Sequence, residues 1–241
     1  HINRDMGNEE KSISNYRQAC ELNPALISSW MSLYEYFKKN NNKPALDHAT
    51  EQINKLKSLP NMLLYIDQVM NEGRLGVAEL KCREFLKKNP THTYAMSQLS
   101  EIANRLGHFD DAELLLEKAV QFNPDDGELR MKYALVLRKK QKFAKTMEQV
   151  NILCDKYPDN LAYQAQKASE IMQNGQHEDA IDLFDDILSK NPHNFSTFTS
   201  KGHALKTLGK TDDAIESYQS AYKIRPDHGE AFFSLANLKT Y

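Results

Sequence analysis

The chain has 241 residues, of which 40% are hydrophobic and 27% are charged, proportions that are ordinary for a water-soluble fold. No segment approaches the run of about 20 apolar residues that a membrane-spanning helix needs. The 31 basic and 33 acidic residues give a net charge of −2, which offers no overall attraction to nucleic acid or to an anionic membrane. Composition therefore argues against membrane and nucleic-acid partners.

Five prolines recur at a constant spacing of 34 residues, at Pro90, Pro124, Pro158, Pro192 and Pro226. A fixed period of this length indicates a solenoid of repeats, because each unit can bury its apolar face only by stacking on its neighbours. Functional residues are therefore expected on the surface of the array and not in one enclosed pocket.

The period divides the chain into units. Residues 1–26 hold a partial repeat, the second helix of a truncated unit. Six repeats follow, at 27–58, 59–92, 93–126, 127–160, 161–194 and 195–228. Residues 229–241 hold the first helix of a further unit or a junction to a following C-terminal domain. Both ends expose apolar helix faces, which favours dimerisation through the end helices.

Each repeat is expected to form two amphipathic helices, and repeat 195–228 shows the pattern clearly. Apolar or small residues spaced three or four apart line one face of a first helix at 195–208. Gly209 ends this helix, because glycine readily adopts the left-handed C-cap conformation. Asp212 and Asp213 then open the second helix, where carboxylates interact favourably with the helix dipole.

Other repeats carry the same turn glycine, at Gly73, Gly107 and Gly175. Each is followed five residues later by an alanine that lets the two helices approach closely. Repeat 127–160 departs from this pattern, because Gln141 stands in place of the glycine and Thr146 in place of the alanine.

Repeat 27–58 departs further. Asn41 replaces the turn glycine, and Pro44 falls in the first turn of the second helix, where proline is tolerated. The repeat is also two residues short, since Asn41 and Gly73 are 32 residues apart. We expect a local irregularity of the solenoid at this place.

Small residues also occupy one position of the first helix in five units, at Ser100, Ala134, Ala168, Gly202 and Ala236. With the 34-residue period, the turn glycines and the prolines, this pattern resembles the tetratricopeptide repeat over essentially the whole chain. The resemblance implies an all-α fold, a right-handed superhelical solenoid of antiparallel helix pairs. It also implies that the first helices line a concave groove, which binds a protein or an extended peptide.

The resemblance places ten candidate partner-binding residues on the groove side of the first helices. They are Glu35, Asp67, Gln98, Glu101, Lys132, Arg138, Lys139, Gln166, Ser200 and His203. The early groove is acidic, and net charges of −5, +4 and −4 follow in repeats 93–126, 127–160 and 161–194. These alternating charges have three interpretations. They attract a partner of complementary charge, they form ion pairs between adjacent repeats, or they only keep the outer faces hydrated.

Two binding modes known in the family do not carry over. The clamp that holds an acidic peptide terminus needs lysine where Met31, Leu63 and Ser97 stand. The asparagine ladder of the glycosyltransferase-linked members needs asparagine where Ser32 and Leu64 stand. The partner class therefore stays open.

The sequence contains no complete motif for catalysis or nucleotide binding. Lys210 and Thr211 follow Gly209 as at the end of a phosphate loop, but Ala204 stands where that loop needs its first glycine. The paired acids lie mostly at starts of second helices, where the helix dipole already explains them. We assign no catalytic residue and no cofactor to this chain.

Metal binding is not expected either. His92, His193 and His228 fall at corresponding turns, but neighbouring repeats are spaced about 10 Å apart, whereas two ligands of one zinc each lie about 2 Å from it. The three cysteines, Cys20, Cys82 and Cys154, show no CxxC spacing. They are expected to be buried small hydrophobes in a reducing, cytoplasmic setting.

The C-terminal residues 232–241 resemble the junction found in bacterial proteins in which tetratricopeptide repeats precede a sulfotransferase domain. The resemblance rests mainly on residues 237–241. This resemblance implies a following domain that uses 3′-phosphoadenosine-5′-phosphosulfate, none of whose binding or catalytic residues lie in this chain.

The sequence thus predicts a non-catalytic scaffold that binds a protein or peptide, as the targeting module of a larger bacterial sulfotransferase. The alternative is a stand-alone assembly or co-chaperone-type adaptor with no attached enzyme. An RNA-binding helical repeat is disfavoured, because no continuous basic groove is present.

Overall fold

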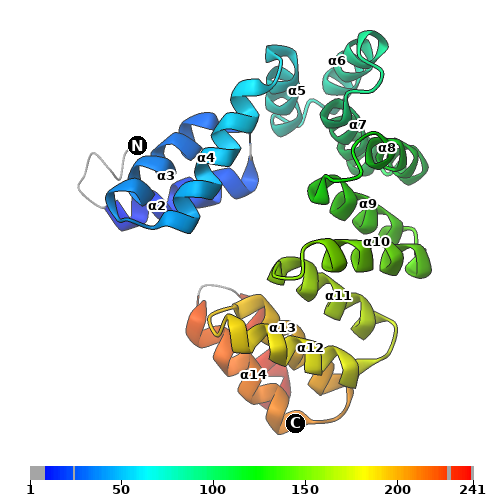
Figure 1. Cartoon of the computed structure of the whole chain (residues 1–241). Helices are drawn as coiled ribbons and strands as arrows, with labels where there is room; N and C mark the ends of the chain where they lie inside the picture. The colour runs from blue at the N-terminus through cyan, green and yellow to red at the C-terminus, as the bar shows by residue number, and fades with distance from the viewer. Residues whose placement is uncertain (1–8, 24, 227–228, 240–241) are drawn as a thin grey trace. The chain divides into compact units, whose positions relative to one another are not determined.

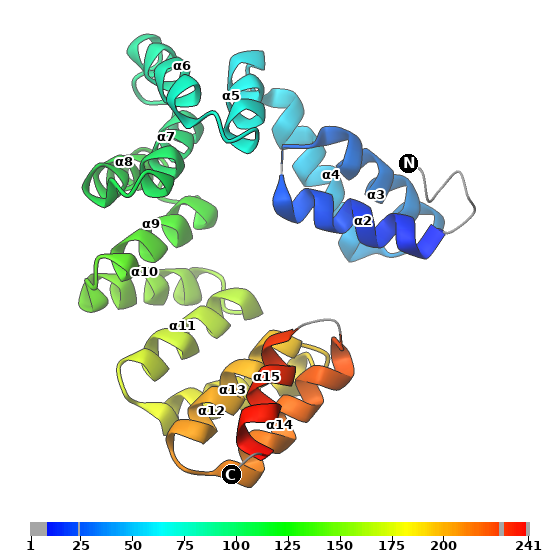
Figure 2. The same cartoon turned by 180° about the vertical axis from the view of Figure 1, so that it is seen from behind.

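The computed structural model describes residues 9–23, 25–226 and 229–239, and these form α-helices joined by short turns (Figures 1 and 2). The prediction of an all-α helical solenoid is confirmed over this part of the chain. The helices are α2 (Glu9–Leu22), α3 (Ile27–Lys39), α4 (Lys43–Ser58), α5 (Asn61–Asn71), α6 (Leu75–Lys88), α7 (Thr93–Arg105), α8 (Phe109–Phe122), α9 (Gly127–Lys139), α10 (Phe143–Lys156), α11 (Leu161–Gln173), α12 (His177–Lys190), α13 (Phe195–Thr207), α14 (Thr211–Ile224) and α15 (Gly229–Lys239).

The chain divides into two compact units, residues 1–115 and 116–241, with the boundary inside α8. In the second unit, packing passes from each helix to the next along the chain, from α9 and α10 to α14 and α15. Each of the six predicted repeat intervals contains one first and one second helix. The exact repeat boundaries stay a prediction, and residues 1–8, Pro24, His228, Thr240 and Tyr241 lie outside the described part.

Every turn inside a helix pair has a left-handed residue. Gly73, Gly107, Gly175 and Gly209 have φ between +74° and +86°. In each turn, the amide of the following residue donates to a carbonyl five residues back, as Lys210 does to Leu205 at 3.0 Å, which is the bond of a Schellman cap. The expected role of the turn glycines is confirmed, although α13 ends at Thr207, one residue before the predicted end.

Asn41 and Gln141 adopt the same conformation without being glycine, with φ of 51° and 57°. Asn42 and Lys142 donate the corresponding amide bonds, each at 3.0 Å. The turn geometry is therefore imposed by the repeat, and these two positions accept a conformation that costs a non-glycine residue about 1–2 kcal/mol.

Two places after each of the repeat prolines Pro90, Pro124, Pro158 and Pro192 lies a residue that caps the next first helix. The side chains of His92, Asp126, Asn160 and Asn194 accept amide hydrogens from the first turns of α7, α9, α11 and α13. Such caps satisfy amides that have no partner within the helix. His92 therefore has a structural role that the sequence pattern did not reveal.

Small residues lie where two helices meet, as predicted, except that Ala236 on α15 is exposed. Ala78, Ala112, Ala180 and Ala214 are fully buried on the second helices. On the first helices, Ser100, Ala134 and Ala168 are at most 3% exposed, and Gly202 lies against the ring of Tyr218. At the start of α9, a Cβ added to Gly127 would lie 2.6 Å from the Tyr163 hydroxyl and 3.1 Å from the Tyr157 ring.

The irregularity expected in repeat 27–58 takes the form of a longer second helix. Helix α4 has 16 residues, whereas α6 has 14, and only Leu59 and Pro60 separate it from α5. Pro44 lies in the first turn of α4, as predicted, and Asn42 caps that helix by accepting the Ala45 amide at 3.3 Å.

Candidate partner-binding surfaces

The ten predicted groove residues all lie on first helices, and they form two sets that belong to different units. The first unit holds Glu35 on α3, Asp67 on α5, and Gln98 and Glu101 on α7. The second unit holds Lys132, Arg138 and Lys139 on α9, Gln166 on α11, and Ser200 and His203 on α13. We call these two sets the unit 1 surface and the unit 2 surface.

On the unit 1 surface, the Asp67 carboxylate is occupied by α7. It accepts a hydrogen bond from the Tyr94 hydroxyl at 2.7 Å and another from the Gln98 amide nitrogen at 2.7 Å. The same nitrogen donates to the Leu63 carbonyl at 2.8 Å, and Gln98 is only 5% exposed. Asp67 and Gln98 thus join two neighbouring repeats, and the structure places Gln98 away from the open surface.

Glu101 also has an intrachain partner. Its carboxylate accepts from the Arg105 Nε at 2.8 Å, and the Arg105 guanidinium reaches the Met70 carbonyl at 3.3 Å. Glu35 is exposed on α3. Arg105 therefore offsets the charge of Glu101, and the Asp67 oxygens already accept hydrogen bonds from two neutral groups, so both carboxylates are less available to a partner than predicted.

On the unit 2 surface, a buried carboxylate joins α9 to α11. Glu170 is 5% exposed, and its Oε1 accepts from the Gln166 amide nitrogen at 2.5 Å and from Arg138 at 3.4 Å. A buried carboxylate is tolerated when it is paired and hydrogen-bonded. Arg138 and Gln166 are therefore fixed in position by Glu170, which the groove prediction did not include.

His203 makes a second link between first helices. Its Nδ1 lies 2.9 Å from the Tyr218 hydroxyl on α14, and its Nε2 lies 3.3 Å from a Glu230 carboxylate oxygen on α15. Burial raises the pKa of the Tyr218 hydroxyl above its ordinary value. The hydroxyl thus stays protonated at neutral pH and serves as a fixed hydrogen-bonding group beside the imidazole.

The remaining predicted residues are more accessible. Lys132 forms an ion pair with Glu128 at 2.9 Å along α9, Lys139 is exposed at the end of α9, and Ser200 is half-buried on α13. Exposed ion pairs along a helix contribute little to stability. These side chains, with Glu35, are the members of the predicted set that can meet a partner at small cost to the fold.

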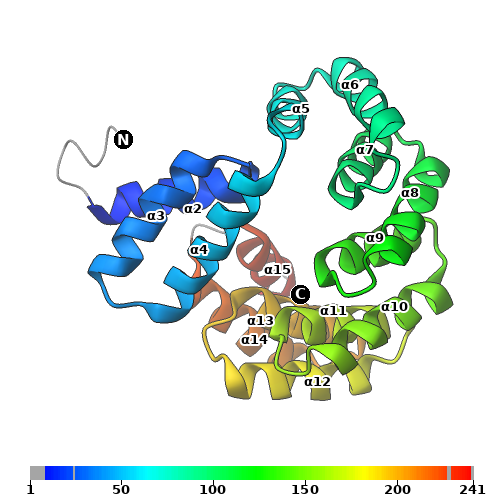
Figure 3. The ribbon, with the colours of Figure 1, turned by 45° about the horizontal axis from the view of Figure 1, so that its top comes forward.

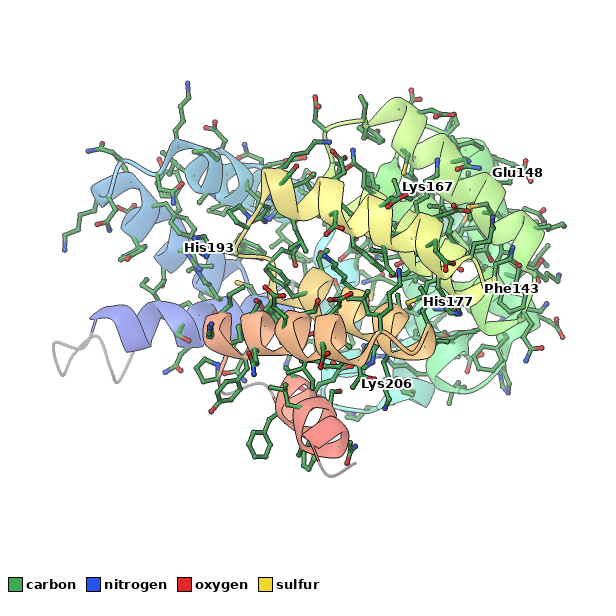
Figure 4. All side chains as sticks on the ribbon, turned by 90° about the horizontal axis from the view of Figure 1, so that it is seen from below. Phe143, Glu148, Lys167, His177, His193 and Lys206 are labelled. Atoms are coloured by element: carbon green, nitrogen blue, oxygen red, sulfur yellow. The ribbon has the colours of Figure 1, made fainter. Side chains whose placement is uncertain are left out.

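The histidines and acidic residues do not gather into a metal site within the part of the chain that the structure describes. The described residues contain no group of three or more His, Cys, Asp or Glu side chains that could hold a metal ion. Figure 4 shows His177 at the start of α12 and His193 in the turn beyond the other end of that helix, so the two histidines are far apart. Lys210 and Thr211 form the N-cap and the first residue of α14, so the short match to a phosphate loop is a helix start.

Two of the three cysteines are buried as predicted, and the third is only partly buried. Cys20 and Cys82 are at most 5% exposed and Cys154 is half-buried. The Cys82 thiol lies 3.1 Å from the Ala95 carbonyl, and burial raises the pKa of that thiol to about 12. These thiols are therefore poor nucleophiles near neutral pH. None of the helices in the described part of the chain has the length and apolarity required to span a bilayer.

Three family models match the chain. A tetratricopeptide-repeat model matches residues 97–160, another matches residues 1–26, and the model of the N-terminal tetratricopeptide-repeat region of Psidin matches residues 133–239. Human protein O-mannosyl-transferase TMTC1 is 22% identical over 148 residues, which are 60% of this chain and 17% of that protein.

Several solved structures share the fold. TTC0263, a thermophilic tetratricopeptide-repeat protein of Thermus thermophilus, has a TM-score of 0.60 at 17% identity, covering 75% of this chain and 98% of that one. YrrB, described as having an unusual peptide-binding site, has a TM-score of 0.57 at 17% identity, covering 77% and 96%. MamA has a TM-score of 0.58 at 17% identity, covering 67% and 94%. The chain is therefore built from tetratricopeptide repeats.

Proposed function

We propose that this chain is a scaffold that binds a protein or an extended peptide on the exposed side of its first helices. One observation carries the proposal most directly. In unit 2, first helices of different repeats are linked by their own polar side chains, Arg138 with Glu170 and His203 with Glu230. Such links fix the surface before a partner arrives, which lowers the entropy that binding must overcome.

The neighbouring polar groups give this surface its recognition chemistry. Lys139 supplies a positive charge, and Ser200 a hydroxyl that can both donate and accept. In unit 1, Glu35 supplies an exposed negative charge. YrrB, which shares the fold, has a peptide-binding site, and this supports a peptide as the partner class.

The test is a selection from a phage-displayed library of random peptides against the whole chain, followed by affinity measurements on the enriched peptides. Lys139→Glu and Glu35→Lys should each weaken binding of the peptides that contact their unit by about tenfold or more, because a complementary charge becomes a repulsive one. Lys145→Glu and Glu216→Lys make the same charge changes on exposed positions of second helices and should leave affinity unchanged. The proposal would be contradicted if the selection enriched no shared peptide sequence. It would also be contradicted if the control variants at Lys145 and Glu216 lost as much affinity as the variants at Lys139 and Glu35.

A sulfotransferase domain following Tyr241 stays a prediction, and the relatives described above do not support it. Its direct test is sulfation by the full-length protein, measured with a protein acceptor and with a small acceptor. If the repeats present the protein acceptor, removal of residues 27–126 should abolish sulfation of that acceptor and spare the small one. Equal retention of both activities would exclude this role. A stand-alone adaptor, dimerisation through the end helices and a cytoplasmic location likewise stay predictions.

A further inference from the structure

Helix packing within unit 1 falls into two groups. Helix α3 packs against α2 and α4, whereas α6 packs against α5 and α7 (Figure 3). The first group has its own core of buried residues, including Ile13, Leu33, Phe37 and Ala49. The second core is built from α5, α6 and α7, with Leu59 at its edge. Among the described residues of unit 1, no helix pair with more than marginal contact connects the two groups.

The sequence of α4 accounts for this separation. In every other second helix, the residues that lie nine and thirteen positions after the left-handed turn residue are apolar. These pairs are Cys82 and Leu86, Leu116 and Val120, Val150 and Cys154, Phe184 and Leu188, and Tyr218 and Tyr222. In α4 the same places hold Thr50 and Asn54, and the Thr50 hydroxyl donates to the Leu46 carbonyl of its own helix at 2.7 Å.

The facing side of α5 is open in the same way. Tyr65 is 42% exposed, whereas Leu99 and Tyr133, one and two periods later, are 4% and 5% exposed. The same side of α4 carries a row of polar residues: Asp47, Thr50, Glu51, Asn54, Lys55 and Ser58.

We propose that helices α2, α3 and α4 form a module that opens and unfolds separately from the repeats after it, with Leu59 and Pro60 as the hinge. The stability of a solenoid is approximately the sum of its repeats and of the interfaces between neighbours. Where an interface is missing, cooperativity is interrupted. A group of this size is marginally stable by itself, so it becomes the first part of the chain to open.

The chain contains the reporter needed to test this. Trp30 on α3 is its single tryptophan and packs edge-on against His48 of α4, with 5.5 Å between ring centroids. Urea unfolding of the whole chain should be followed by tryptophan fluorescence and by far-UV circular dichroism. The fluorescence transition is expected at lower urea, coinciding with the first of two steps in the dichroism signal. Coincidence of the two complete curves would overturn the proposal.

A designed variant tests the cause. Thr50→Leu with Asn54→Leu, combined with insertion of two residues after Ser58, restores both the apolar positions and the 34-residue spacing. The two transitions should then move together. The matched control carries the same insertion with Glu51→Leu and Lys55→Leu, which moves the leucines one residue around α4 and keeps the net charge. If both variants merge the transitions equally, stacking through these positions is not the cause and the proposed origin is wrong.

Amide hydrogen exchange on the unmodified chain gives an answer that does not depend on the variants folding. Amides at the centre of α3 should exchange at least tenfold faster than those at the centre of α7, because they open without the later repeats. Equal protection in α3 and α7 would contradict a separate module.

Discussion

Gly202 lies directly against Tyr218: a Cβ added to the glycine would stand 2.6 Å from Cε1 of the ring. Tyr218 is fully buried, and its hydroxyl is held beside His203, so the ring cannot move away freely. This contact determines how closely helices α13 and α14 pack against each other.

Gly202→Ala should therefore destabilise the chain by about 1–3 kcal/mol, the usual cost of overpacking a well-filled core. The measurement is urea unfolding followed by far-UV circular dichroism. Gly76→Ala is the matched control, because nothing lies within 4 Å of a Cβ at Gly76. It should stabilise α6 by about 0.5–1 kcal/mol. Equal effects of the two changes would exclude the close contact.

Gln141→Gly should stabilise the chain. Gln141 has φ of 57°, so glycine removes a conformational cost of about 1–2 kcal/mol while increasing the entropy of the unfolded chain by a smaller amount. We expect a net gain of about 0.5–1 kcal/mol in the free energy of unfolding. Gly175→Ala makes the reverse change at a corresponding turn and by the same balance should cost about 0.5–1 kcal/mol. A loss of stability in Gln141→Gly would show that the side chain makes contacts that outweigh the strain.

Arg138→Met should cost about 1–3 kcal/mol, because it leaves the nearly buried Glu170 carboxylate without its cation. Lys190→Met removes a cation from the exposed pair with Asp186 and should change stability by less than about 0.5 kcal/mol. Adding Glu170→Gln to Arg138→Met should recover part of the loss, since no buried charge then remains. Without that recovery, the loss would have to be assigned to packing of the arginine stem.

Cys82 should contribute a pH-dependent term to stability. Burial raises the pKa of its thiol from 9.0 to about 12, so the folded chain keeps a proton that the unfolded chain releases. The stabilisation is fully present below about pH 9 and is lost as pH rises toward about 12. The difference in free energy of unfolding between the native chain and Cys82→Ala should therefore shrink between pH 9 and 12. A constant difference would show that the thiol is not titrating as expected.

The helix pairs and their turns could be predicted from sequence because glycine, alanine and proline mark them locally. Gly209 and Ala214 are five residues apart, and backbone sterics alone connect such residues to a left-handed turn and a close helix contact. Asn41 adopts the same left-handed turn conformation although it is not a glycine. Its position within the repeat therefore predicts this conformation better than its residue type does.

The polar links between repeats could not be predicted in the same way. Asp67 and Gln98 are 31 residues apart, and no local pattern says that their side chains bond to each other rather than to a partner. Glu170 has no distinguishing sequence pattern, and its burial depends on Arg138, which lies 32 residues earlier on α9. Sequence reasoning named candidate helix faces but could not say which polar groups on them already have partners within the chain.

The tyrosines packed on Gly127 show that the repeats are not interchangeable parts. Repeats 161–194 and 195–228 begin with Leu161 and Phe195 where repeat 127–160 begins with this glycine, whose missing side chain makes room for Tyr163. Replacing repeat 127–160 by a copy of repeat 161–194 or of repeat 195–228 would put a large side chain into that space. Any rearranged or lengthened array made from this chain must therefore keep a glycine in front of Tyr163, even though all the units share one period.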